Sequence, residues 1–195
     1  DDLDDVFDDG DKKSMLKVGT ELFTFIGGTP NVYLDFQPID LITLQVGVGT
    51  TPFNRHMDVA LIREYSSFTI KDISPGLYYS LAGKFNFTVP EYNDFNYYYY
   101  AKYKKWSYDY LTDVAVTRSK ISFGAGYQIG LPGRFNLDVT AGLFIGKDRA
   151  SLDPTATLQN DETIPFYNTT IHSSDTRVEN RIISFELGCG LNFAL

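Results

Sequence analysis

The segment from Ser119 to Gly146 constrains the fold more than any other part of the chain, because its two halves alternate between apolar and polar or small residues. The apolar positions lie on either side of the turn 131–134, and they are Ile121, Phe123, Ala125, Tyr127, Ile129, then Phe135, Leu137, Val139, Ala141, Leu143 and Ile145. Period-two alternation predicts a β-hairpin with one wholly apolar face. The other face carries Gly, Asn, Asp and Gln, which could not line an ordinary hydrophobic core. We therefore expect the apolar face to meet lipid and the polar face to fill a narrow interior.

The same alternation recurs along the rest of the chain. It predicts further strands at 15–26, 32–37, 42–49, 57–68, 77–87 and 183–193. Eight strands is the number at which a closed barrel can fill its interior with side chains. We therefore predict that residues 14–195 form an all-β, eight-stranded antiparallel up-and-down transmembrane β-barrel.

The connections between these strands differ in length. Short turns are expected near 38–40, 71–76 and 131–134, whereas the segments 90–117 and 147–178 interrupt the alternation and are expected to be long loops at the opposite end. Short turns at one end and long loops at the other are typical of outer-membrane barrels.

Three pairs of segments resemble small β-barrels of the Gram-negative outer membrane, of the OmpA and OmpX size class, and among them a barrel family of largely unknown function. They are 28–36 with 41–49, 62–65 with 75–79, and 124–128 with 134–138, and the resemblance covers residues 14–195. It implies an integral protein of the bacterial outer membrane, and its motifs imply no catalytic residue.

A soluble ligand-binding barrel such as a lipocalin has the same strand number and is the main alternative. Its interior would be lined by large apolar groups and its outer face would be rich in charge. Here the polar face has many Gly residues and charges of both signs, and Lys and Glu are almost absent from the apolar rows. The pattern therefore favours the membrane barrel.

The first 13 residues hold seven Asp and two Lys, so this tail carries −5 of the net charge of −8. We expect residues 1–13 to be a disordered acidic tail, with docking to a basic partner as the alternative. A calcium-binding EF-hand is excluded, because Phe7 and Leu16 fall where such a loop needs oxygen ligands. The negative charge also argues against nucleic acid as a partner.

Charged residues on the predicted inner face carry both signs and can pair with one another, as charges in a low-dielectric interior must. They are Lys17, Glu21, Asp35, Lys84, Asp138 and Glu186. We predict that they form a structural network of salt bridges. A proton or ion pathway through the same residues is the alternative, although eight strands usually leave no open pore.

Two histidines are the candidates for chemistry. His56 has Asp58 nearby, and His172 is followed by Ser173, Ser174 and Asp175, so either could belong to a catalytic dyad at the barrel rim. No further motif supports this alternative, and the single Cys189 lies in an apolar row where packing explains it. We expect no catalytic activity, no cofactor and no metal.

The segment 91–110 is unusually aromatic, with ten aromatic residues in twenty and eight of the fourteen tyrosines. We predict that it is an extracellular loop that binds a partner. Its expected anchors are Tyr97, Tyr98, Tyr99, Tyr100 and Trp106, with Lys102, Lys104 and Lys105 meeting an acidic protein or lipopolysaccharide phosphate. The alternative is that extended strands carry these rings as an interfacial girdle.

The sequence thus predicts a non-enzymatic barrel of the bacterial outer membrane. We expect it to be a structural component or an accessory subunit of a larger complex for secretion, protein insertion or nutrient uptake, in contact with membrane lipid and lipopolysaccharide. The alternative function is a rim enzyme that modifies lipid A or cleaves protein through His56 or His172.

Overall fold

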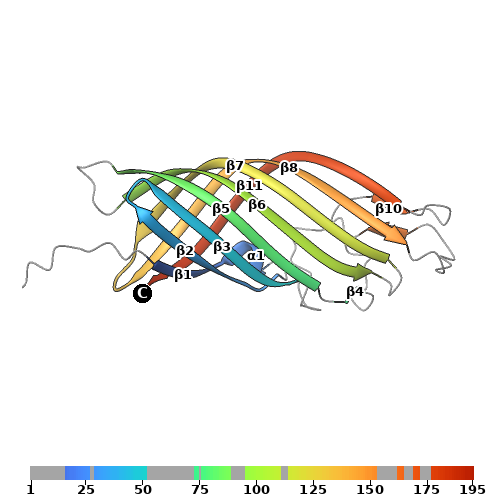
Figure 1. Ribbon diagram of the computed structural model, residues 1–195, viewed down its shortest axis with the longest axis horizontal. Coiled ribbons are helices and arrows are strands. Elements are labelled where there is room, and N and C mark those ends of the chain that lie inside the picture. The colour runs from blue at the N-terminus through green and yellow to red at the C-terminus, as the bar shows by residue number, and fades with distance from the viewer. Residues whose placement is uncertain are drawn as a thin grey trace, which may run out of the picture.

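The structure is a computed structural model that describes residues 16–26, 29–51, 73–74, 76–88, 95–110, 114–152, 162–164, 169–171 and 177–195. Eight antiparallel strands close into a barrel (Figure 1): β1 (Leu16–Glu21), β2 (Asn31–Ile39), β3 (Ile42–Thr51), β5 (Gly76–Thr88), β6 (Phe95–Tyr110), β7 (Val114–Gly130), β8 (Phe135–Leu152) and β11 (Arg177–Ala194). Each strand pairs with the one before and after it in the chain, and β11 pairs with β1. The predicted eight-stranded up-and-down barrel is therefore confirmed.

Four short elements accompany the barrel. The helix α1 (Leu22–Ile26) follows β1, and β4 (Ile73–Ser74) pairs with the end of β6. The strands β9 (Glu162–Ile164) and β10 (Thr169–Ile171) form a two-stranded sheet of their own. Within the described ranges, no helix is both long and apolar enough to cross a membrane.

The predicted strand number is right, but the observed set of strands differs from the predicted one. The predicted strand at 57–68 lies outside the described residues, and β3 pairs directly with β5 from Ile42–Phe85 to Thr51–Gly76, so no strand separates them. The missing member is β6, within the segment 90–117 that was expected to be a loop. Rings occur on both faces of β6, where buried Tyr98 alternates with exposed Tyr97 and Tyr99. Hydropathy therefore does not alternate along this strand.

Other predicted boundaries also change. The first strand stops at Glu21 rather than at 26, because α1 follows it. The segment 147–178 is not wholly a loop, since β8 continues to Leu152 and β11 begins at Arg177. The predicted tail, residues 1–13, lies outside the described residues.

The two ends of the barrel differ in their connections. The turns at Asp40–Leu41 and 131–134 lie at the end of the barrel where β1 begins and β11 ends, which we call the short-turn end. The end of β5 at Thr88 and the start of β6 at Phe95 lie at the same end. Gly133 has a φ of 79° in the turn 131–134, a conformation that favours glycine. The connections 52–72 and 153–176 leave from the opposite end, which we call the long-loop end.

The side chains are distributed inside out. Outward residues such as Leu34, Val46 and Phe123 expose 43%, 52% and 54% of their surface. The buried residues are mostly polar and include Glu21, Asp35, Gln45, Lys84, Lys104, Arg118, Ser122, Gln128, Asp138 and Asn192. In the part of the chain that the structure describes, five of the eight buried hydrophobic residues are tyrosines, which also carry a hydroxyl. The barrel interior is therefore a polar core, and the apolar face of each strand points away from it.

Among the described residues, one side of β11 is only partly paired. Strand β1 pairs with β11 only from Lys17–Ala194 to Glu21–Gly190. Beyond Gly190, none of the strands described pairs with β11 on the side away from β8. The outward side chains there are unusually exposed, at 74% for Ile183, 81% for Phe185 and 71% for Leu187. We call residues 177–189 of this strand the β11 edge.

Candidate functional site

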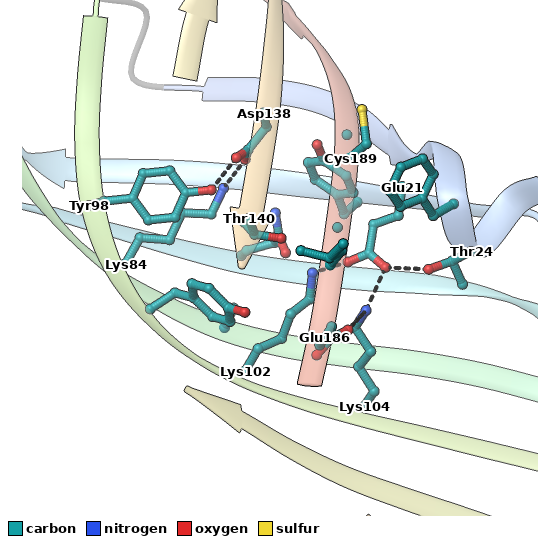
Figure 2. A pocket seen from close by; sticks show the side chains of 18 residues that line it. Glu21, Thr24, Lys84, Tyr98, Lys102, Lys104, Asp138, Thr140, Glu186 and Cys189 are labelled. Carbon is teal, nitrogen blue, oxygen red and sulfur yellow. Dashed lines mark hydrogen bonds and ion pairs between the residues drawn. The ribbon is translucent and has the colours of Figure 1, made fainter. Parts of the chain in front are cut away.

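The candidate site is the polar interior, in which charged side chains form two clusters. The first cluster is centred on Lys84 of β5, whose Nζ lies 3.0 Å from Asp35 Oδ2 of β2 and 2.9 Å from Asp138 Oδ2 of β8. These side chains are 6%, 3% and 6% exposed. Figure 2 shows Lys84 and Tyr98 both directed at Asp138. The cluster thus ties together strands from opposite walls of the barrel.

Neutral groups complete this first cluster. Gln45 Nε2 donates a hydrogen bond to Asp35 Oδ1 at 2.8 Å, and the Tyr98 hydroxyl donates to Asp138 Oδ1. The Lys84 ammonium also lies 5.1 Å from the centre of the Tyr98 ring. Two carboxylates facing one ammonium would be costly to bury alone, and these donors offset part of the excess negative charge.

The second cluster lies nearer the long-loop end and holds three lysines and two glutamates. Lys104 Nζ is 2.9 Å from both Glu21 Oε2 and Glu186 Oε1, and Lys120 Nζ is 3.1 Å from Glu186 Oε1. Lys102 also pairs with Glu21. Thr24 of α1 donates its hydroxyl to Glu21 at 2.8 Å, so the helix is linked to the interior charges (Figure 2).

The two clusters balance each other in charge. The first has one cation and two anions, and the second has three cations and two anions, so together they hold four of each sign. A cavity of about 50 Å³ lies between them. This volume suits a few water molecules and is too small for an organic substrate. The arrangement therefore fits a structural ionic network rather than a substrate pocket.

All six residues predicted for the interior network lie on the inner face. Glu21, Asp35, Lys84, Asp138 and Glu186 belong to the two clusters, as the ion pairs above show. Lys17 lies apart from them, and its Nζ donates to Gln128 Oε1 at 2.9 Å.

Three interior lysines were not predicted from the sequence. Lys102 and Lys104 were expected at a partner surface, but both point inward from β6, and Lys120 joins them from β7. The period of two residues along a strand could have revealed them, because positions 98, 100, 102 and 104 of β6 share one face. Tyr98 and Lys104 on this face are buried.

The segment that was predicted to be a partner-binding loop forms a barrel strand instead. All of its expected anchors lie in β6, where Tyr98 and Tyr100 are buried at 2% and 7% exposure and cannot meet a partner. Trp106 faces inward and its ring centre lies 5.4 Å from that of Tyr78. Tyr97 and Tyr99 remain exposed, at 49% and 63%, near the short-turn end. A partner role for these two residues stays a prediction.

The residues proposed for a rim enzyme cannot be placed. His56, Asp58, His172, Ser173, Ser174 and Asp175 lie outside the described residues. Within the ranges that are described, no three His, Cys, Asp or Glu side chains are grouped so that they could hold a metal ion. Cys189 is a free cysteine of intermediate exposure.

Comparison with known proteins gives no match: no protein family fits the chain, and no curated protein or solved structure is significantly similar to it.

Proposed function

We propose that this chain is an integral, non-enzymatic β-barrel of the bacterial outer membrane. The observation that carries the proposal is the inside-out distribution of its side chains. Apolar side chains are exposed on four different strands, for example at Val46, Leu81, Phe123 and Leu143. In water, exposing so much apolar surface would cost free energy, and burying charged groups inside the barrel would not compensate for it. In a bilayer the same distribution is the stable one.

The height of the apolar surface supports this environment. Along β8 it runs from Phe135 to Ile145, and along β11 from Phe193 to Ile183, in register throughout. Eleven residues span about 34 Å of extended strand, which a tilt of about 40° reduces to about 26 Å. This value matches the apolar band of about 25 Å in known outer-membrane barrels.

Aromatic pairs border the apolar surface at the short-turn end. Phe135 and Phe193 have ring centres 5.2 Å apart, and Tyr97 and Tyr127 have theirs 4.9 Å apart. Phe87 and Tyr99 form a third pair at 5.0 Å. Aromatic rings are enriched where such barrels pass from hydrocarbon to headgroups, so this girdle supports placing the short-turn end at one membrane surface.

The packed interior supports a role for the outer surfaces of the barrel. A cavity of about 50 Å³ favours neither solute passage nor catalysis in the barrel, so the outer surfaces are the parts available for function. We propose a structural component or an accessory subunit of a larger outer-membrane complex. Exposed Tyr97 and Tyr99 are candidates for contact with other subunits, since Tyr brings large contact area at low entropic cost.

The membrane assignment is tested by the electrophoretic mobility of the refolded full-length chain. A closed barrel satisfies its backbone hydrogen bonds internally, so the folded form should resist SDS until it is heated. Unheated and heated samples are then expected to differ in apparent mass after refolding in detergent or vesicles. A chain that is folded and monodisperse in buffer without detergent would overturn the assignment.

The accessory role needs a separate test in native membranes. The Tyr97→Ser/Tyr99→Ser variant should keep its heat-modifiable mobility but lose proteins that co-purify with the wild-type chain. Leu34→Ser, which removes an outward side chain on β2, across the barrel from β6, is the matched control. If the wild-type chain, the double variant and the control recover the same amount of partner proteins, Tyr97 and Tyr99 are not part of the interface.

A further inference from the structure

Strands β6, β7, β8 and β11 continue beyond the apolar surface toward the long-loop end, and their outward side chains change character within one row. The last apolar row across these strands is Tyr103, Ile121, Ile145 and Ile183. The next outward row is Lys105, Ser119, Lys147 and Arg181. Two more rows follow, Ser107, Thr117, Arg149 and Glu179, then Asp109, Ala115, Ser151 and Arg177. The transition from hydrocarbon-like to charged surface is therefore abrupt.

These three rows form a basic patch on an acidic protein. They contain Lys105, Lys147, Arg149, Arg177 and Arg181 against Asp109 and Glu179, a net charge of +3 in a chain whose net charge is −8. The inward neighbours Val116, Arg118 and Ala150 are buried at 1%, 7% and 0% exposure, which fixes the rows between them on the outer surface. We call the five cations with Glu179 the basic rim.

Glu179 holds four of these cations together. Its carboxylate lies 2.7 Å from Lys147 Nζ, 3.4 Å from Arg149 Nη2, 3.5 Å from Arg177 Nη2 and 3.8 Å from Arg181 Nη2. The hydrogen bond from Lys147 lowers the pKa of Glu179, so this group is ionised at neutral pH. One carboxylate offsets one cation and leaves an excess of three.

The guanidinium groups remain accessible. The side chains of Arg149, Arg177 and Arg181 are 46%, 54% and 77% exposed. Arginine presents a planar fork of donors that matches the oxygens of a phosphate group, and it keeps its charge at any physiological pH. The cluster thus combines positive charge, several free donors and a fixed arrangement around one carboxylate.

We propose that the basic rim binds the phosphate groups of a membrane lipid in the leaflet at the long-loop end. The first charged row lies about 7 Å beyond the last apolar row. A lipid whose chains lie against Ile145 and Ile183 would therefore place its headgroup beside Lys147 and Arg181. An excess charge of +3 suits a headgroup with more than one phosphate, as in lipopolysaccharide. This inference rests on the proposed membrane location.

The test uses the full-length chain in phosphatidylcholine vesicles that contain lipopolysaccharide or the same lipid after enzymatic dephosphorylation. The bound lipid is measured by mass spectrometry after the protein is extracted and washed in detergent. The wild-type chain should retain the phosphorylated lipid roughly tenfold better than the dephosphorylated one, because charge-assisted hydrogen bonds are lost with the phosphates. Equal retention of both lipids would overturn the proposal.

Two variants locate the site. Arg149→Gln/Arg177→Gln/Arg181→Gln should lower retention to the level of the dephosphorylated lipid. Arg134→Gln, an exposed arginine at the short-turn end, is the control and should retain as much lipid as wild type. Glu179→Gln removes the only acid in contact with the four cations among the described residues, and it should raise retention. If the salt bridges of Glu179 are purely structural, Glu179→Gln should instead lower the heat resistance of the barrel without raising the amount of lipid retained.

The same experiment separates the other outcomes. Sodium phosphate at millimolar concentration should not displace the lipid, since one free anion makes fewer contacts; displacement would indicate a free-phosphate site and overturn the lipid assignment. Heat-modifiable protein that retains no phosphorylated lipid would refute this inference alone. Failure of the wild-type chain to enter vesicles at all would refute the proposed function.

Discussion

The barrel has two walls that differ in length and in surface. The long wall consists of β6, β7, β8 and β11, with 16 to 18 residues each, whereas the short wall consists of β1, β2, β3 and β5, with 6 to 13 residues. Crossing a bilayer takes about 9–11 tilted residues. The short wall therefore has little beyond what crossing requires, and β1 has less. The surplus residues of the long wall carry the basic rim.

The difference shows that two requirements act on the same strands. In the proposed membrane location, contact with hydrocarbon would account for the apolar rows, which both walls share, while the rows beyond them are free to carry charge. The two walls are joined inside by ion pairs such as Lys84–Asp138. Along one side they are joined by the pairing of β5 with β6, and along the other, which we call the seam, by the shorter pairing of β1 with β11. The variants below probe the interior link first, then the outer surfaces, and finally the seam.

The largest effect is expected from loss of the interior link. Lys84→Met leaves Asp35 and Asp138 buried without their cation, and removal of one partner of a buried pair costs about 3–5 kcal/mol. The free energy of unfolding in urea, measured in vesicles by Trp106 fluorescence and mobility, should fall by this amount.

The control for Lys84→Met removes the whole charge cluster. In Asp35→Asn/Lys84→Met/Asp138→Asn no charge is left unpaired, so this triple variant should be more stable than Lys84→Met alone. If the triple variant is the less stable of the two, uncompensated charge is not the cause of the loss.

A smaller effect is expected from charge placed on the outer surface of the long wall, and it depends on depth. Val139→Arg, within the apolar surface, should cost about 2–4 kcal/mol of unfolding free energy in vesicles. Thr117→Arg, in the second charged row of the same wall, should cost about 0–1 kcal/mol. Equal costs at the two positions would contradict the assigned height of the membrane.

The sequence predicts the part of the fold in which the two faces of a strand differ in hydropathy. This holds for β7 and β8, where Phe123 and Leu143 alternate with Gly124 and Gly142. It fails for β6, because Tyr98 faces the interior and Tyr99 faces outward, and tyrosine suits both a polar core and a membrane interface.

The interior site could be predicted only in part for a different reason. Alternation along single strands identifies Lys84 and Asp138 as inward residues. Their pairing depends on which strands lie opposite each other across the barrel, and that was obscured when 57–68 took the place of β6 in the predicted order. The end of β1 could not be predicted either. Leu22 continues the apolar alternation of β1, although it is the first residue of α1.

The next effect concerns close packing inside the long wall. A Cβ at Gly126 of the long wall would lie 2.1 Å from the Tyr98 ring, whose hydroxyl donates to Asp138, whereas a Cβ at Gly83 of the short wall meets nothing within 4 Å. Gly126→Ala should therefore cost about 1–3 kcal/mol of unfolding free energy. Gly83→Ala is the control, and the same loss in both variants would show that the effect comes from the strand backbone and not from the interior.

The smallest effect is expected at the seam of the wild-type chain. It is measured as the difference in amide hydrogen-exchange rate between β8 and the β11 edge. Along β8 every residue from Phe135 to Leu152 pairs with β7, with β11 or with both, so its amides should be uniformly protected. Along an antiparallel strand, successive N–H groups point to opposite sides. On the β11 edge, alternate amides should therefore be protected by β8, while those between them exchange faster.

The exchange pattern also tests whether the unpaired N–H groups of the seam are compatible with a membrane. An unpaired strand edge cannot face hydrocarbon, so the N–H groups between Ile183 and Cys189 must meet water or another part of the polypeptide. Fast exchange at alternate positions in vesicles would indicate that water reaches the edge, beside α1 and the second charge cluster. Protection of every amide from Ile183 to Cys189 to the level of β8 would show instead that a further segment pairs with the edge and that the two walls are closed along their full height.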